Sequence, residues 1–277
     1  MIKSNAFVTV LYGNNVYMSG AIVLGYTLMR TKTTYDRIIL VTPDVSAEYI
    51  GYLRNVYTHV IKISYVDVNP TIFLKSDTRF RDVFTKLACL ELIAYEKIIL
   101  LDLDMIVCKN IDHLFKLDPP AACIKHHNLP YGQKIDPKMI CDGTKLVGSI
   151  NAGLMLLKPD LAEWNEIKTD IKNNTYLQKY KYPEQDYLSL RYCDKWTSIT
   201  FNYNFQFGLT HRVKQLGYKI SDIYVIHYSS SYKPWNDLIP DRITGPDELK
   251  FKRQHQKYYQ MWKSIYANLK SKYLLPF

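Results

Sequence analysis

Residues 97–104 read Lys-Ile-Ile-Leu-Leu-Asp-Leu-Asp, an apolar run of strand length that ends in two carboxylates. An uninterrupted apolar run is typical of a strand buried in the middle of an α/β sheet. Residues two apart in an extended segment point to the same side, so Asp102 and Asp104 are predicted to converge on one ligand. In such sheets ligands bind at the carboxyl ends of the strands, which is where this pair falls.

Two converging carboxylates suit a hard divalent cation, Mg²⁺ or Mn²⁺, which can in turn hold a diphosphate. The Asp-x-Asp spacing is short and common, and the alternative interpretation is a strand that ends in a solvated acidic turn. The position of the pair directly after a buried strand favours the metal site.

The chain before this run alternates between strand-like and helix-like segments. Strands are predicted at residues 6–12, 37–42 and 60–66, and helices at residues 16–30, 46–55 (with Ser46 as N-cap) and 85–95. Strands separated by helices of this length imply an α/β fold with a mostly parallel central sheet and helices on both faces, as in Rossmann-like proteins. No Gly-x-Gly-x-x-Gly follows the first strand, so a dinucleotide-binding fingerprint is absent.

The chain after this run contains a long segment without clear periodicity, residues 125–150. Segments of this length in compact domains are often functional. Around it we predict strands at residues 121–124, 154–157 and 224–227, and helices at residues 110–115, 159–172, 183–192 and 247–270. No linker or internal repeat is evident, so we expect a single domain over residues 1–277.

Composition limits the class of protein but does not name a ligand. Of the 277 residues, 47% are hydrophobic and 14% aromatic, which is enough to fill a sizeable core. The formal net charge of +10 fits an anionic ligand. On charge alone, nucleic acid, a membrane surface and a sugar nucleotide all remain open.

The cysteines and the N-terminal residues give an indication of the cellular compartment. The five cysteines are Cys89, Cys108, Cys123, Cys141 and Cys193. Their odd number, without a Cys-x-x-Cys pair, argues against a structural zinc site and a disulfide framework and favours reduced thiols. Residues 1–5 are polar, the apolar run 6–11 is too short for a signal peptide, and no run approaches the roughly 20 apolar residues of a membrane span. We therefore expect a cytoplasmic protein.

A series of short motifs, in order along nearly the whole chain, resembles the glycogenin-like proteins of glycosyltransferase family 8. The matching motifs are Phe7-Val8-Thr9, residues 20–25, Thr85-Lys86-Leu87, Asp102-Leu103-Asp104, Asn110-Ile111-Asp112, Asn151-Ala152-Gly153, Glu184-Gln185, and His227 with Lys233-Pro234-Trp235. The resemblance implies a GT-A type fold, with a nucleotide-binding half at residues 1–115 and an acceptor and metal-completing half at residues 116–277. It also implies a UDP-sugar donor, a homodimer, and no nucleic acid or membrane partner.

The resemblance also implies roles for individual residues. It makes Asp102, Asp104 and His227 the metal ligands, with Mn²⁺ preferred over Mg²⁺ because a histidine joins two carboxylates. It makes Lys86, Glu184 and Gln185 the catalytic group. The implied substrate-binding residues are Val10, Leu11, Tyr12, Tyr17, Lys86, Asp102, Leu103, Asn151, Ala152, Gly153, Gln185, Ser230 and Lys233.

Read without the resemblance, the same residues have ordinary structural explanations. The lysines could be solvated surface charges, His227 a structural hydrogen bonder, and Val10, Leu11 and the tyrosines ordinary core. Asn151 could be a turn residue, and Glu184 and Gln185 could cap a helix.

The chain departs from the glycogenin pattern mainly on the acceptor side. Ser230 replaces a glycine, Glu184 stands where the family has an aspartate, and residues 205–214 contain no tyrosine to act as the acceptor. We expect a retaining hexosyltransferase that moves glucose from UDP-glucose to itself or to a glycan or protein. The candidate self-acceptors, chosen for expected exposure, are Tyr131, Tyr176, Tyr180 and Tyr182. The alternative is another UDP-sugar (galactose, xylose or glucuronate) and an external acceptor.

Two other classes of protein are weaker alternatives. Haloacid dehalogenase-like phosphatases also begin with a hydrophobic strand and Asp-x-Asp, but they expect Thr or Val two residues after the second aspartate, where Ile106 stands. A non-catalytic glycan- or nucleotide-binding protein could use the same fold, and a turnover assay with UDP-sugars separates it from an enzyme.

Overall fold

A seven-stranded sheet forms the centre of the computed structural model, which describes residues 4–13, 17–73, 82–125, 127–174, 180–206, 219–230, 233–235, 246–273 and 275. The strand order is β10-β6-β9-β4-β1-β2-β3. The strands are β1 (Ala6–Leu11), β2 (Asp36–Val41), β3 (His59–Lys62), β4 (Ile98–Leu101), β6 (Ala121–Ile124), β9 (Ile150–Leu157) and β10 (Thr197–Ser198).

The pairing within this sheet is mostly parallel. β1 pairs in parallel with both β2 and β4, and β2 with β3. β9 is the exception, because it runs antiparallel to β4 on one side and to β6 on the other. The beginning of β9 therefore lies beside the carboxyl end of β4, with Leu154 opposite Leu101.

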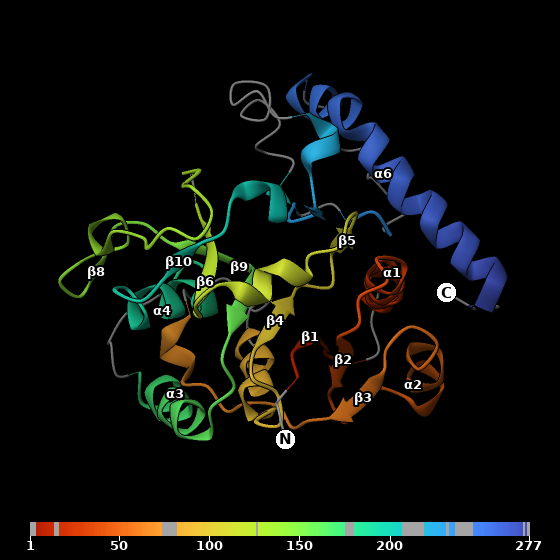
Figure 1. The fold of residues 1–277 in the computed structure, drawn as a ribbon. Coiled ribbons are helices and arrows are strands. Elements are labelled where there is room, and N and C mark those ends of the chain that lie inside the picture. Colours follow the sequence, from red (N-terminus) through yellow and green to blue (C-terminus); the bar gives the residue numbers. More distant parts are fainter. Residues whose placement is uncertain are drawn as a thin grey trace.

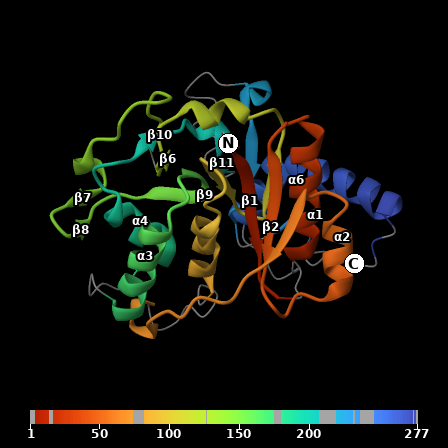
Figure 2. The ribbon, with the colours of Figure 1, turned by 60° about the horizontal axis from the view of Figure 1, so that its bottom comes forward.

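Helices cover both faces of the sheet, as predicted. Alternate residues of a buried strand point to opposite faces, so β1, β2, β4, β6 and β9 each contribute to two separate hydrophobic cores. One core is covered by α1 (Tyr17–Arg30), α2 (Ala47–Leu53) and α6 (Pro246–Tyr273), the other by the 3₁₀ helix η3 (Val83–Glu91), α3 (Leu161–Asn173) and α4 (Pro183–Arg191). Figures 1 and 2 show α3 and α4, in green, on the side of the molecule away from α1, α2 and α6.

A second sheet, of three short strands, begins directly after the acidic motif. It contains β5 (Met105–Val107), β11 (Phe205–Gln206) and β12 (Val225–His227), in the order β11-β12-β5. Because β5 begins directly after Asp104, the Asp-x-Asp motif is the junction between the large and the small sheet. β12 runs antiparallel to β5, with His227 opposite Met105.

Short elements complete the described part of the chain. They are the 3₁₀ helices η1 (Pro70–Ile72), η4 (Asp112–Lys116), η5 (Pro137–Met139), η6 (Phe201–Tyr203) and η8 (Ile220–Asp222), and the hairpin β7 (Cys141–Asp142) and β8 (Lys145–Leu146). The hairpin and η5 lie inside the long segment at residues 125–150. In the described part of the chain, no helix combines the length and the apolar character that crossing a bilayer requires.

The structure corrects several details of the sequence predictions. The predicted strand at residues 60–66 ends at Lys62, the predicted helix at residues 85–95 is the 3₁₀ helix η3, and the predicted strand at residues 154–157 begins at Ile150. The expectation that all cysteines are reduced is wrong, because Cys141 and Cys193 form a disulfide. This bond ties the β7–β8 hairpin to the end of α4.

Candidate functional site

The three residues predicted to hold a metal ion lie together at the carboxyl edge of the sheet. Asp102 follows β4, Asp104 precedes β5, and His227 ends β12, which pairs with β5. One ligand atom from each residue lies within 4.8 Å of the others. The Nε2 atom of His227 is 3.2 Å from Asp104 Oδ1 and 4.0 Å from Asp102 Oδ2. Two carboxylates and an imidazole form a mixed oxygen and nitrogen donor set, and this set fits Mn²⁺.

Lys233 balances part of the negative charge of this cluster. Its Nζ atom is 2.5 Å from Asp104 Oδ2 and donates to the backbone oxygen of Tyr228 at 2.8 Å. Burial alone would raise the pKa of Asp104, but the charges of His227 and Lys233 outweigh it and hold that pKa well below its usual range. Asp104 is therefore a carboxylate at neutral pH although it is only 6% exposed.

Lys86 connects the acidic motif to α4. Its Nζ atom lies 3.0 Å from Asp102 Oδ1, 3.0 Å from Glu184 Oε1 and 3.3 Å from the backbone oxygen of Ala152. Burial would lower the pKa of Lys86, but the charges of Asp102 and Glu184 raise it above its ordinary value. Lys86 is 4% exposed, so the interpretation as a solvated surface charge is wrong.

The beginning of β9 and the beginning of α4 meet beside this lysine. The Nε2 atom of Gln185 donates to Ser149 Oγ, and its Oε1 accepts from the backbone N–H of Ala152 at 3.3 Å. Glu184 and Gln185 are both buried in the first turn of α4. Lys86 therefore links Glu184, which was predicted to lie near the sugar, to Asp102 of the Asp102, Asp104 and His227 cluster. Gln185 joins the same network through the backbone of Ala152.

The residues predicted to form the uridine pocket lie at the end of β1 and the start of α1. Val10 and Leu11 are buried in the two hydrophobic cores, so their side chains are core, as the structural interpretation predicts. Tyr12 is half-buried, and Tyr17 packs edge-on against Trp235 with their ring centroids 5.0 Å apart. This contact places the Lys-Pro-Trp motif beside α1.

Gly20 and Ser230 show how tightly this side of the site is built. A Cβ atom on Gly20 would lie 2.7 Å from the backbone oxygen of Leu103 and 2.8 Å from Trp235 Cζ3, so α1 approaches the Asp-x-Asp turn more closely than any side chain would allow. The Ser230 hydroxyl lies 3.2 Å from the Tyr259 hydroxyl on α6. Ser230 therefore has a polar contact in place of the glycine of the family pattern.

Asn204 lies at the site although no sequence pattern linked it to the predicted metal ligands. In the structure the Asn204 side chain, 1% exposed, contacts both His227, at 2.8 Å, and Asn151, at 2.7 Å.

The tyrosines proposed as self-acceptors differ in exposure. Tyr131 is 42% exposed and Tyr182 is 36% exposed, whereas Tyr180 is 3% exposed. The prediction that Tyr180 is exposed is therefore wrong, because its ring packs in the core on the α3 and α4 side. Tyr176 lies outside the described residues. Lys125, at the end of β6, places its Nζ atom 3.7 Å from the centroid of the Tyr182 ring.

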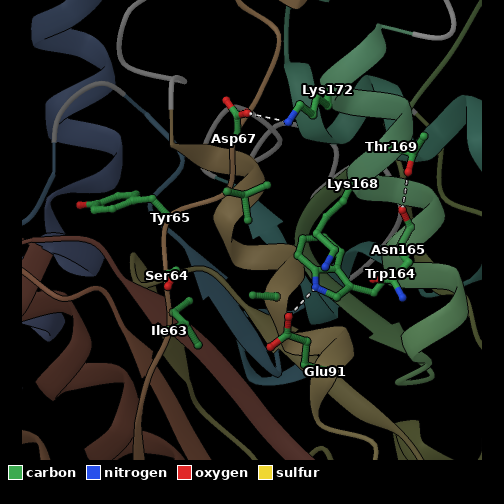
Figure 3. Close-up of a pocket in the computed structure, with 12 residues that line it drawn as sticks. Ile63, Ser64, Tyr65, Asp67, Glu91, Trp164, Asn165, Lys168, Thr169 and Lys172 are labelled. Carbon is green, nitrogen blue, oxygen red and sulfur yellow. Dashed lines mark hydrogen bonds and ion pairs between the residues drawn. The ribbon is translucent and has the colours of Figure 1, made fainter.

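A separate groove of about 550 Å³ lies between residues 63–67 and α3, with η3 at its floor (Figure 3). The Nε1 atom of Trp164 donates to Glu91 Oε1 at 2.7 Å, and Lys172 lies 3.5 Å from Asp67. None of the predicted site residues lines this groove, so it is distinct from the Asp102, Asp104 and His227 cluster.

The substitution Gly153→Ala is expected to weaken divalent metal binding by about tenfold or more. Changes to the groups that orient a metal ligand typically lower metal affinity by this amount. A Cβ atom at this position would lie 2.4 Å from Cε1 and 2.7 Å from Nδ1 of His227, so the imidazole must move. Titration of the purified variant with Mn²⁺ measures the change. An alanine at the exposed Gly51, where a Cβ meets nothing within 4 Å, is the matched control. Equal affinities of the two variants would contradict the expectation.

Comparison with known proteins identifies the family. The model of glycosyl transferase family 8 matches residues 8–238. An uncharacterized protein, R707, of Acanthamoeba polyphaga mimivirus is 66% identical over 269 residues, which cover 97% of this chain and 96% of that protein. Galactinol synthase 1 of Solanum lycopersicum is 27% identical over 279 residues, which cover 95% of this chain and 82% of the synthase.

Solved structures show the same fold at low sequence identity. The galactosyltransferase LgtC, in complex with donor and acceptor sugar analogs, superimposes with a TM-score of 0.57 at 18% identity and covers 95% of each chain. The glycosyltransferase GlyE of Streptococcus pneumoniae TIGR4 gives a TM-score of 0.56 at 20% identity, over 98% of this chain and 64% of that one. The fold is thus of the GT-A type, as predicted. With the family model matched over most of its length, the chain belongs to glycosyltransferase family 8.

Proposed function

We propose that the protein is a Mn²⁺-dependent, retaining hexosyltransferase that uses a UDP-sugar as donor. The observation that supports this most strongly is the convergence of Asp102, Asp104 and His227 within 4.8 Å, beside two lysines at the carboxyl edge of the sheet. Buried charged groups gathered at one point are typical of catalytic sites.

The charged side chains have distinct roles in this proposal. Asp102, Asp104 and His227 would hold the divalent ion, which when bound neutralises the charge of the departing diphosphate. Lys233, anchored on Asp104, adds a point charge on the same side. Because Lys233 already lies at the cluster before the donor binds, little rearrangement of the side chain is needed.

The sugar side of the site is assigned to Lys86, Asn151, Glu184 and Gln185. The Lys86 Nζ atom lies 3.0 Å from Glu184 Oε1, and this ion pair fixes the position of the buried Glu184 side chain. Retention follows either from attack by Glu184 on the anomeric carbon or from attack by the acceptor on the face of the leaving group. A glycosylated Glu184 peptide trapped during turnover would establish the first route.

The proposed sugar is glucose, because of the resemblance to glycogenin-like proteins. The relatives also include galactinol synthases and an inositol phosphorylceramide glucuronosyltransferase of Arabidopsis thaliana, 29% identical over 83% of this chain and 42% of that protein. We expect release of UDP from UDP-glucose to exceed that from UDP-galactose, UDP-xylose and UDP-glucuronate, and to stop in EDTA. Preference for another sugar would overturn the choice of glucose, and undiminished release in EDTA would overturn the metal dependence.

The proposed acceptor is the protein itself or an external glycan or protein. The exposure of Tyr131 and Tyr182 supports the first choice, because an acceptor hydroxyl has to reach a neighbouring site. Intact-mass analysis after incubation with Mn²⁺ and UDP-glucose decides between the two. Hexose increments that disappear in the double variant Tyr131→Phe/Tyr182→Phe would establish self-transfer, whereas UDP release without increments would point to an external acceptor.

A further inference from the structure

A short chain of buried hydrogen bonds joins His227 to the beginning of β9. His227 Nδ1 lies 2.8 Å from Asn204 Oδ1, Asn204 Nδ2 lies 2.7 Å from Asn151 Oδ1, and the Gly153 N–H donates to the same Asn151 oxygen at 3.0 Å. The three side chains are 4%, 1% and 8% exposed, respectively, so water has little access to the chain.

The donor and the acceptor of each of these hydrogen bonds can be assigned by starting from the backbone N–H of Gly153. The backbone N–H of Gly153 can only donate, so the Asn151 atom that it contacts must be the amide oxygen. Asn204 must then present its NH₂ group to that oxygen, which leaves its own oxygen facing His227. Because an amide oxygen only accepts, His227 carries a proton on Nδ1.

This direction has a consequence at the other ring nitrogen. In the neutral imidazole with the proton on Nδ1, Nε2 presents a lone pair, and it lies 3.2 Å from the carboxylate of Asp104. A divalent ion bound between Nε2 and the Asp104 carboxylate would use this lone pair. The chain of amides thus prepares Nε2 as a metal ligand and fixes the orientation of its ring.

We infer that Asn204 is a positioning residue that fixes the tautomer of His227 and couples the metal ligands to Asn151. The inference rests on the proposed function, because it takes His227 and the two aspartates as the ligands of Mn²⁺. Asn204 is not one of the proposed metal ligands. It acts through His227 on one side and through the Asn151 oxygen on the other.

The experiment measures Mn²⁺ binding directly, by the loss of the electron paramagnetic resonance signal of the free ion. Replacement of an outer-shell partner typically lowers metal affinity about 10- to 100-fold, and we expect this range for Asn204→Leu and for Asn204→Ala. The first variant conserves volume and the second avoids crowding, so agreement between them excludes a steric cause. Asn204→Asp keeps an oxygen that accepts from Nδ1 but loses the group that donates to Asn151 Oδ1, so we expect its Mn²⁺ affinity to lie between those of Asn204→Leu and the wild type.

Asn202, in η6 and two residues before Asn204, provides a matched control. It is 9% exposed and its Nδ2 atom donates to the backbone oxygen of Asp222, away from the metal ligands. Asn202→Leu therefore removes a comparable buried amide hydrogen bond, and we expect its Mn²⁺ affinity to be unchanged. Thermal unfolding of all variants checks that each is folded at the temperature of the titration.

Asn151→Ala tests the coupling. In the wild-type background we expect it to weaken Mn²⁺ binding, because Asn204 loses the group that orients it. In the Asn204→Leu background it should have no further effect, since neighbours in one network are not additive. Additive effects, or equal losses in Asn204→Leu and Asn202→Leu, would overturn the inference and leave the proposed function intact. A wild-type protein that binds no Mn²⁺ would overturn both.

Discussion

Asp104→Asn is expected to lower the rate of UDP-sugar turnover about a thousandfold, which corresponds to roughly 4 kcal/mol of lost transition-state stabilisation. The substitution removes the charge that faces His227 Nε2 on one oxygen and Lys233 on the other. It changes neither the size of the side chain nor its place between the two sheets. A loss of activity in a folded protein would therefore report the loss of charge and not of shape.

Asp67→Asn is the control for this variant. Asp67 carries the same charge but lies in the groove beside α3, with its side chain 80% exposed. We expect its turnover to stay within about twofold of the wild type, because exposed ion pairs contribute little. Undiminished turnover by Asp104→Asn in EDTA would refute the proposed role of the cluster.

Lys86→Met is expected to lower the free energy of unfolding by about 3 kcal/mol, because removal of one partner leaves buried charges without compensation. Lys86 is the cation between Asp102 and Glu184, and the Glu184 side chain is only 10% exposed. Methionine retains most of the aliphatic volume, so the change isolates the charge. Urea unfolding of the two proteins measures the difference.

Two further variants show whether the loss comes from the uncompensated carboxylate. Glu184→Gln in the Lys86→Met background removes that charge, and it should restore a substantial part of the lost stability but not the activity. Lys172→Met, at a lysine whose side chain is 68% exposed, should change stability by less than about 0.5 kcal/mol. A Lys86→Met protein as stable as Lys172→Met would contradict this account of the buried charges.

The strands that the sequence predicted well are apolar along nearly their whole length and buried on both faces. β1 and β4 are examples. Their paired residues, Ala6, Phe7 and Val8 opposite Ile98, Ile99 and Leu100, are all apolar. β9 was predicted four residues too short because Asn151, Ala152 and Gly153, which follow its first residue Ile150, are residue types with low strand propensity. Contacts with both neighbouring strands, and not local preference, hold these residues extended.

The positions of Asp102 and Asp104 were predictable, because two residues spaced two apart at the end of a strand present their side chains on the same side. His227 was found through a resemblance, since a lone histidine at a strand end has no distinctive pattern. The role of Asn204 arises from the pairing of β11 with β12, which brings residues of distant segments together. The disulfide between Cys141 and Cys193 was missed because their separation of 52 residues carries no spacing signal.

Because β9 runs antiparallel to β6, the segment that connects them, residues 125–149, begins and ends at adjacent points of the sheet. This segment leaves the sheet after Ile124 and re-enters at Ile150, and these two residues are opposite each other in adjacent strands. The entropic cost of closing such an excursion grows only slowly with its length. Longer, shorter or chemically different segments can therefore be grafted between the same two strands without moving Asp102, Asn151 or the strands that hold them.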